Sequence, residues 1–248
     1  KRRQKTNRLC LNRKTVILYK KTMYRALLFL FALQFSFSQS ELKRVLGEFK
    51  ELKVYDGINV VLKKSNRNFL VILGENSQNV VVVNKSGTLK LKMGLFKKFK
   101  GENTIINVEH KSPVFLIESQ QGSKIIIKDT VSQSTVYFKT SSGGQISAQL
   151  NVKKVRSISN YGGIIQITGR TGSHEAKAAS GGVIKASKLI SGQTIINTFS
   201  GGVCSAFGTE VFEATATLGG VANVYGSPKS LTQSSSFGGQ VIEKQINE

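Results

Sequence analysis

The chain has 248 residues, with 36 Lys and Arg against 14 Asp and Glu, 24 Gly, 2 Pro and no Trp. This length is ample for one all-β domain or for two ordinary domains. Two cysteines, Cys10 and Cys204, exclude a disulfide-stapled fold and a multi-cysteine zinc site. Two histidines leave little material for a histidine-based metal centre. The 40% apolar composition excludes a wholly disordered chain, and the net charge of +22 raises the question of a nucleic-acid partner.

The first 38 residues differ in composition from the rest of the chain. Residues 1–22 are basic and are predicted to be a non-native extension upstream of the true start, although a long basic leader is the alternative. Residues 23–38 are predicted to be a signal peptide, because basic residues precede the apolar run Ala26–Phe37 and Ser36 and Ser38 provide small side chains for cleavage. The run is shorter than the roughly 20 residues of a membrane-spanning helix, and a membrane anchor or a short core helix is the alternative.

This leader changes what the net charge means. Ten basic and no acidic residues lie in residues 1–38, so residues 39–248 carry 26 basic and 14 acidic residues, a charge of +12. The mature chain is predicted to be exported to the periplasm, the outer-membrane surface or the medium, and not to be an integral membrane protein. Export separates the chain from nucleic acid, so no nucleic-acid partner is predicted; a basic exported protein suits an anionic surface.

Gly-Gly pairs recur through the C-terminal half at spacings of 19, 19, 20, 18 and 19 residues. A fixed short period is the mark of a solenoid, in which each unit stacks on its neighbours. The pairs are predicted to be structural turns, because a coil that turns sharply at one corner needs positive φ or close backbone approach there. The pairs are Gly143-Gly144, Gly162-Gly163, Gly181-Gly182, Gly201-Gly202, Gly219-Gly220 and Gly238-Gly239.

Residues after each pair alternate in polarity. The second and fourth residues are apolar and the third is polar in five of the six units, as in Ile165, Gln166 and Ile167. Period-two alternation predicts a strand with one buried face and one solvated face. Cys204 falls on the buried ladder and is predicted to be a small core residue. The sixth unit loses the pattern at Glu243, which is typical of a terminal coil that caps a stack.

The N-terminal half has strand signals without this period. β-Branched runs such as Phe69–Leu73 and Val114–Glu118 alternate with turn residues such as Lys85-Ser86-Gly87, and no segment has a helical stripe. Residues 39–248 are therefore predicted to be a single β-solenoid domain, with irregular coils over 45–130 and regular repeats over 131–248.

Three features together resemble the head GIN domain family, which is described as the head of auto-transporter adhesins. They are the opening FKELKVYDGINVVLK (Phe49–Lys63), the glycine layers, and the closing VYGSPKSLTQSSSFGGQV (Val224–Val241). The resemblance covers roughly residues 45–244. It implies a right-handed parallel β-helix at the surface of bacteria of the Bacteroidetes type, with no established activity. Gly-Gly stands here where relatives often have Gly-Ser-Gly-Asp, so the acidic residue of those turns is absent.

Signals for catalysis are weak. Parallel β-helices that act on acidic polysaccharides usually need clustered carboxylates, but Asp56 and Asp129 are the only mature Asp residues and lie far apart in sequence. His110 is expected to end a strand and His174 to lie at a turn, each exposed or locally hydrogen-bonded. No catalytic residue, cofactor or metal is predicted. A carbohydrate-active β-helix, either a lyase or a hydrolase, is the alternative function.

The densest positive charge surrounds the segment LKMGLFKKFKG. One interpretation is a solvated hairpin loop whose charge limits edge pairing. The other is a contact for anionic glycans or lipid head groups, through charge and aromatic anchoring. The favoured function is therefore an exported, non-enzymatic envelope or cell-surface scaffold that acts as an adhesin-like binding module. Its candidate contact residues are Lys90, Lys92, Phe96, Lys97, Lys98, Phe99 and Lys100.

Overall fold

The computed structural model describes residues 41–245, so the predicted extension (1–22) and signal peptide (23–38) lie outside the described residues. Within this range, no helix is long and apolar enough to cross a bilayer. The elements in chain order are β1 (Leu42–Val45), β2 (Glu51–Val54), β3 (Asn59–Lys64), β4 (Phe69–Leu73), η1 (Ser77–Asn79), β5 (Val80–Lys85), β6 (Thr88–Met93), η2 (Leu95–Lys97), β7 (Ile105–His110), β8 (Leu116–Gln120), β9 (Lys124–Ile127), β10 (Val131–Ser141), β11 (Gln145–Asn160), β12 (Ile164–Ala179), β13 (Val183–Phe199), β14 (Val203–Phe207), β15 (Val211–Thr217), β16 (Val221–Tyr225), β17 (Ser230–Ser236) and β18 (Gln240–Lys244).

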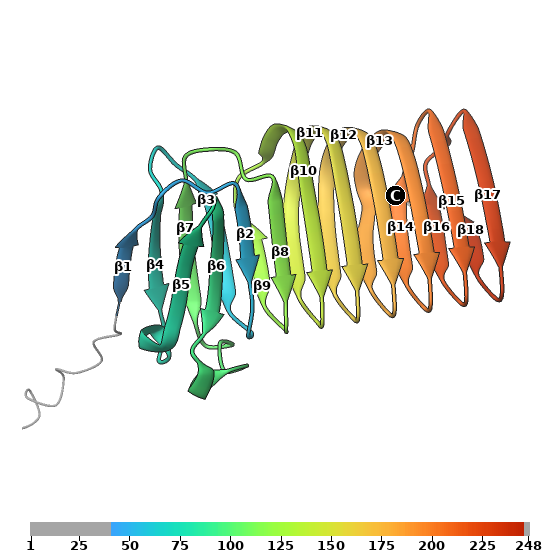
Figure 1. The fold of residues 1–248 in the computed structure, drawn as a ribbon. Helices are drawn as coiled ribbons and strands as arrows, with labels where there is room; N and C mark the ends of the chain where they lie inside the picture. The colour runs from blue at the N-terminus through green and yellow to red at the C-terminus, as the bar shows by residue number, and fades with distance from the viewer. Residues whose placement is uncertain (1–40, 246–248) are drawn as a thin grey trace, which may run out of the picture. The chain divides into compact units, whose positions relative to one another are not determined.

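These strands wind into a β-solenoid of about seven turns, roughly 19 residues apart (Figure 1). Followed from its N-terminal end, the described chain coils in the right-handed sense (Figure 1). The predicted all-β class and the predicted solenoid are both confirmed. Successive coils pair in parallel and in register, so that Ile146, Ile165 and Ile184 form one ladder that continues into Cys204.

Each regular coil has two faces joined by two corners. The pre-turn face leads into the glycine pair and contains β8, β10, β15, β17 and the second halves of β11, β12 and β13. The post-turn face leaves the pair and contains β9, β14, β16, β18 and the first halves of the same long strands. One corner is the glycine turn, and the other is a bend through which the long strands run without interruption.

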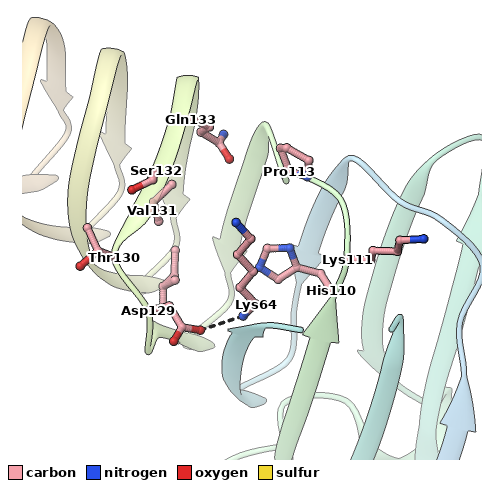
Figure 2. Close-up of a pocket in the computed structure, with 10 residues that line it drawn as sticks. Lys64, His110, Lys111, Pro113, Asp129, Thr130, Val131, Ser132 and Gln133 are labelled. Atoms are coloured by element: carbon pink, nitrogen blue, oxygen red, sulfur yellow. Dashed lines mark hydrogen bonds between the residues drawn. The ribbon is translucent and has the colours of Figure 1, made fainter. Parts of the chain in front are cut away.

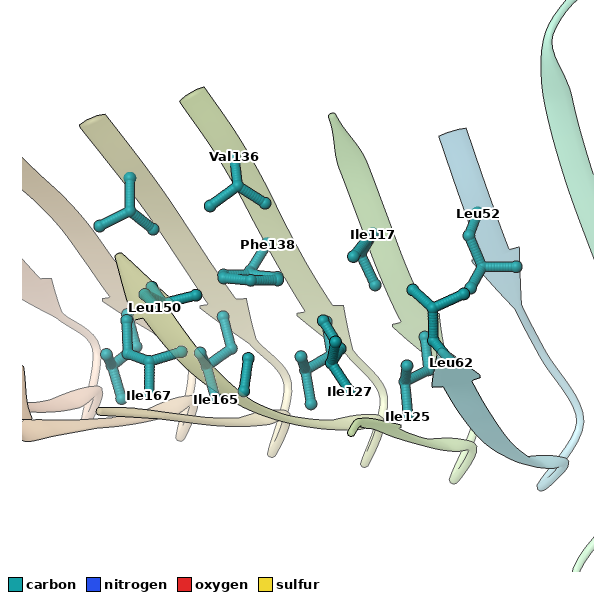
Figure 3. Close-up of a cluster of buried hydrophobic side chains, with 14 of the residues drawn as sticks. Leu52, Leu62, Ile117, Ile125, Ile127, Val136, Phe138, Leu150, Ile165 and Ile167 are labelled. Carbon is teal, nitrogen blue, oxygen red and sulfur yellow. The ribbon is translucent and has the colours of Figure 1, made fainter. Parts of the chain in front are cut away.

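Alternate side chains from both faces fill one continuous core (Figure 3). The core is Leu- and Ile-rich near the N-terminal end and Ala-rich near the C-terminal end, so the two faces enclose a narrower space there. The small residues before the glycine pairs, such as Thr140, Ser159 and Ala178, are buried beside the turn. Residues labelled in Figure 3 are Leu52, Leu62, Ile117, Ile125, Ile127, Val136, Phe138, Leu150, Ile165 and Ile167.

The two ends of the stack are closed differently. At the C-terminal end, Gln233 and Glu243 occupy inward positions of the last coil, and the Gln233 Nε2 donates to Glu243 Oε1 at 2.6 Å. This polar pair stands where earlier coils have Ala214 and Val224, in agreement with the predicted cap. At the N-terminal end, β4 pairs antiparallel with β1 and β7, and β5 pairs antiparallel with β6. These antiparallel additions are why the first half lacks the 19-residue period.

Candidate functional site

Each glycine pair belongs to the same tight turn, but its two glycines serve different needs. In the turn at Ser180, that residue has φ 49° and Gly181 has φ 73°, the two positive values of a type I′ turn. Gly182 has no positive φ, yet a Cβ on it would lie 2.1 Å from the carbonyl oxygen of Ser159. The first glycine therefore meets a conformational demand, and the second permits close approach of two backbones.

The turns align into one edge of the solenoid, which we call the glycine-turn edge. At four of the six turns, the carbonyl of the residue before the pair accepts a hydrogen bond from a glycine N–H of the preceding coil, as in Gly201 N–H to Leu218 and Gly219 N–H to Phe237. The turns of earlier coils continue the same column in register. The glycine-turn edge contains residues 56–57, 94–103, 121–122, 142–144, 161–163, 180–182, 200–202, 218–220 and 237–239.

The longest segment of this edge is the loop 94–103, between β6 and β7, which replaces a tight turn in its coil (Figure 1). Hydrogen bonds hold the base of the loop: Gly101 N–H donates to the Asp56 carbonyl at 3.0 Å, and Asn59 Nδ2 donates to the Glu102 carbonyl at 2.7 Å. The buried Asp56 carboxylate also accepts the Met93 N–H at 3.0 Å. The loop is therefore anchored at its base while η2 projects from it.

The structure brings five of the seven predicted contact residues together on this loop and places the other two on the adjacent strand. Phe96, Lys98, Phe99 and Lys100 are exposed, and Lys97 is half-buried. Lys90 and Lys92 are exposed on β6, on the outward side of the pre-turn face. Leu95, which the sequence analysis missed, is also exposed. Leu95 could have been predicted as a contact residue, because it lies beside Phe96 in a lysine-rich segment bounded by glycines.

These five lysines have no carboxylate partner, unlike Lys53 and Lys139 on the same face. Within residues 41–245, none of the five forms an ion pair. By contrast, Lys139 Nζ lies 2.9 Å and Lys53 Nζ 3.8 Å from the buried carboxylate of Glu118. The loop region thus presents positive charge that the described protein does not neutralise.

A small pocket of about 100 Å³ lies at the opposite corner (Figure 2). Lys64, His110 and Asp129 line it, and Asp129 accepts the Lys64 backbone N–H at 2.8 Å. Burial lowers the pKa of His110, and its Nδ1 lies 2.9 Å from the Ser112 carbonyl oxygen.

The pocket differs from ligand-binding and catalytic sites in size and chemistry. Sites for drug-sized ligands are usually about 300–1,000 Å³, and glycoside hydrolysis uses two facing carboxyl groups. This pocket is smaller and has one carboxylate, already engaged by backbone.

Two other titratable side chains are buried in the core. Cys204 is fully buried, as predicted, and its burial raises the pKa of the thiol. The prediction for His174 is wrong, because it lies within β12 and points inward instead of lying at a turn. Its Nε2 is 3.2 Å from Ser157 Oγ, its Nδ1 has no partner, and burial lowers its pKa to about 4. Residues 41–245 contain no group of three His, Cys, Asp or Glu side chains suited to hold a metal ion.

The fold and its edge define a class: a β-solenoid whose most distinctive surface is an anchored, lysine-rich loop. The chain belongs to the family described as "Putative auto-transporter adhesin, head GIN domain", whose model matches residues 48–228. No curated protein sequence matches the chain.

Solved structures with a similar fold include proteins from Bacteroides and Parabacteroides species. A putative adhesin from Bacteroides fragilis superposes with a TM-score of 0.76 at 18% identity, covering 85% of this chain and 98% of that chain. A putative lipid binding protein from Parabacteroides distasonis gives 0.67 at 16% identity, covering 84% and 98%. A putative adhesin from Parabacteroides merdae gives 0.63 at 14% identity, covering 84% and 97%. At these identities the likeness establishes the fold.

Proposed function

We propose that this chain is an exported, non-catalytic binding module of the cell envelope or cell surface, and that its lysine-rich loop contacts an anionic partner. The single observation that carries the proposal is the cluster of five lysines without carboxylate partners beside exposed Phe96 and Phe99. Exposed aromatic rings leave apolar area in water, and unpaired lysines leave positive charge without a partner. The two together are typical of a surface that binds an anionic partner.

Export and the adhesin-like role have separate support. The predicted signal peptide supports export to the periplasm, the outer-membrane surface or the medium. The family description and the names of the solved relatives support a binding role, since they refer to adhesins and to a lipid binding protein. The anionic partner is proposed as an acidic polysaccharide or a lipid head group, which offer the same charged chemistry to lysine.

The test is binding of the full chain to immobilised acidic polysaccharide and to lipopolysaccharide over a range of salt. We expect binding at low salt that disappears near 0.5 M, because charge contacts at an exposed surface are screened. Replacing the five lysines by glutamine should reduce low-salt binding at least about tenfold, since each surface contact contributes up to about 1 kcal/mol. The replaced residues are Lys90, Lys92, Lys97, Lys98 and Lys100.

A matched variant separates the loop from net charge. It changes five exposed lysines at the other corner that form no ion pair within the described residues, so it lowers the charge equally. Unchanged binding in the loop variant, or equal loss in both, would contradict the proposal. Release of unsaturated sugars from the same polysaccharides would instead support the carbohydrate-active alternative. The control residues are Lys111, Lys128, Lys153, Lys154 and Lys188.

A further inference from the structure

The most exposed large apolar side chains gather on the glycine-turn edge. Seven such side chains among the described residues are more than half exposed, and six of them belong to this edge. The seventh, Val45, lies at the end of β1, paired with Phe69, and is 84% exposed. The six are Phe96 (99%), Phe237 (82%), Leu95 (78%), Tyr161 (67%), Phe99 (63%) and Leu218 (59%).

Coil stacking sets these six side chains along one line. The loop 94–103 lies in the coil next to the Asp56-Gly57 turn, and parallel pairing carries the column onward through Tyr161 to Phe237. Eight strand spacings of about 4.8 Å separate the first and last of these layers, which gives a line roughly 38 Å long. These six side chains, which we call the apolar tips, lie at both ends and in the middle of this line.

The surface around this line is also poor in charge. From Gln121 onward, no turn of the glycine-turn edge contains a charged residue. The first outward row of the post-turn face, directly after the turns, is β-branched and half-buried in four successive coils. Acidic residues occur only at the N-terminal end of this edge, at the buried Asp56 and at Glu102 in the loop, with Glu75 nearby. The four row residues are Ile164, Val183, Val203 and Val221.

Four of the six tips have a positive φ, which does not suit them: Phe99 in the loop has φ 60°, and the other three belong to glycine-pair turns. Tyr161, Leu218 and Phe237 have φ of 48°, 49° and 50°, a region that Gly, Asn and Asp tolerate and bulky side chains rarely adopt. Equivalent positions in other coils carry Ser180 and Ser200, so the turn itself does not require an aromatic or aliphatic residue. Neither packing nor turn geometry explains these three side chains, because they point into solvent.

We propose that the glycine-turn edge docks lengthwise on an anionic lipid bilayer, with its apolar tips in the interface and the loop lysines among the head groups. This inference rests on the proposed function and names the anionic partner. A lipid surface fits because the tips form a convex line, which a deformable apolar medium can receive along its whole length. Lysine side chains keep their charge at the head groups while their stems cover apolar surface.

The test is flotation of the full chain with vesicles of phosphatidylglycerol and phosphatidylcholine, compared with phosphatidylcholine alone. The double variant Leu218→Ser, Phe237→Ser, at the far end of the line from the lysines, should weaken partitioning about tenfold or more, because two large apolar side chains no longer enter the interface. Val45→Ser is the control away from the edge, since Val45 is an apolar side chain that is 84% exposed. All variants keep the same N-terminal segment, so any contribution from it cancels.

A position-specific probe gives a second, independent readout. With Cys10→Ser as background and Cys204 buried, a polarity-sensitive dye on Ser200→Cys reports on the middle of the edge. Its emission should shift to the blue when anionic vesicles are added, and the same dye on Val45→Cys should not respond. An unshifted edge probe, or an equal shift at both positions, overturns the inference.

The outcomes separate this inference from the proposed function. If the double variant binds vesicles normally but the five-lysine variant no longer binds soluble dextran sulfate, the anionic contact stands and the lipid edge is wrong. If the double variant changes only the protein's own oligomeric state, the edge is an interface between copies and the lipid inference is again overturned. If neither variant changes any binding, both proposals are wrong.

Discussion

The two edges of the solenoid arise from the same coil but present opposite surfaces. At the glycine-turn edge the chain reverses through a tight turn, and from Gln121 onward these turns are uncharged and several carry apolar tips. At the other corner, which we call the bend edge, the long strands run on through a curve. The bend edge contains residues 128–131, 151–154, 169–173, 188–192, 208–210 and 226–229.

Charge follows this division. The bend edge carries eight charged residues, as expected where a strand crosses into water and its side chains must be solvated. The comparison indicates that the two corners of a coil have different roles. The tight turn requires glycine at two positions but accepts different side chains at the position before them, so that side chain is available for binding. The charged residues of the bend edge are Lys128, Asp129, Lys153, Lys154, Arg170, Lys188, Glu210 and Lys229.

The largest expected loss of stability comes from a substitution in the glycine-turn edge. Gly182→Ala should lower the free energy of unfolding by about 4 kcal/mol, because its Cβ would lie 2.1 Å from a backbone oxygen that cannot move without separating two coils. Gly192→Ala, at the bend edge, places its Cβ 3.0 Å from the Gly172 oxygen and should lower it by about 1 kcal/mol. Urea unfolding followed by circular dichroism measures both.

A further control distinguishes the two glycines of one turn. Gly181→Ala meets nothing closer than 4.0 Å and should show only the cost of placing alanine at positive φ, about 1–2 kcal/mol. Equal losses for Gly181→Ala and Gly182→Ala would contradict the assignment of conformation to the first glycine and close approach to the second.

The next effect concerns pH and the strand that leaves the bend edge. His174 follows the bend in β12, and burial lowers its pKa from 6.5 in the unfolded chain to about 4. Between these values the unfolded chain binds a proton that the folded protein does not, so stability present above pH 6.5 falls as the pH drops toward 4. The loss should reach roughly 3 kcal/mol. Chemical denaturation at several pH values measures it.

His174→Val is the matched variant, because Val155 occupies the same inward position one coil earlier. It should remove most of the loss between pH 6.5 and 4, while the titration of carboxylates continues below that range. An unchanged pH profile in the variant would show that His174 is not the group responsible.

A smaller change is expected to raise stability, and it concerns the apolar tips that have positive φ. Leu218→Asn should raise the free energy of unfolding by about 0.5–1 kcal/mol, because asparagine adopts positive φ more readily and the exposed leucine gives up little packing. The same variant should bind anionic vesicles less well. Greater stability with weaker binding would indicate that the residue serves function at the expense of stability. Lower stability would mean that Leu218 is a packing residue.

The regular coils were the most predictable part of the structure. The glycine period and the alternation around Ile165 and Ile167 are local signals that repeat, so they predict both the solenoid and the buried ladder. The capping role of Glu243 was predictable for the same reason, because a charged residue interrupts an apolar ladder there.

Features set by distant segments could not be predicted in this way. The antiparallel pairing of β4 and β5 depends on which free edge each strand meets, and their sequences do not specify it. His174 was misplaced at a turn because its segment, GRTGSHEAKA, contains two glycines, whereas the chain curves there within one continuous strand. The alignment of Leu95, Tyr161 and Phe237 on one edge became visible only when the coils were stacked.

The smallest expected change in stability concerns an ion pair of the bend edge. Glu210 Oε2 and Lys229 Nζ lie 2.7 Å apart, but both side chains are more than half exposed. Glu210→Gln should change the free energy of unfolding by less than about 0.5 kcal/mol, because water and salt screen an exposed pair. Glu118→Gln is the contrast, since that carboxylate is nearly buried against Lys139 and its loss should exceed 1 kcal/mol. A large effect at Glu210 would mean that the bend edge depends on its ion pairs; a negligible one would show that its charges serve to solvate a corner already held by the strands.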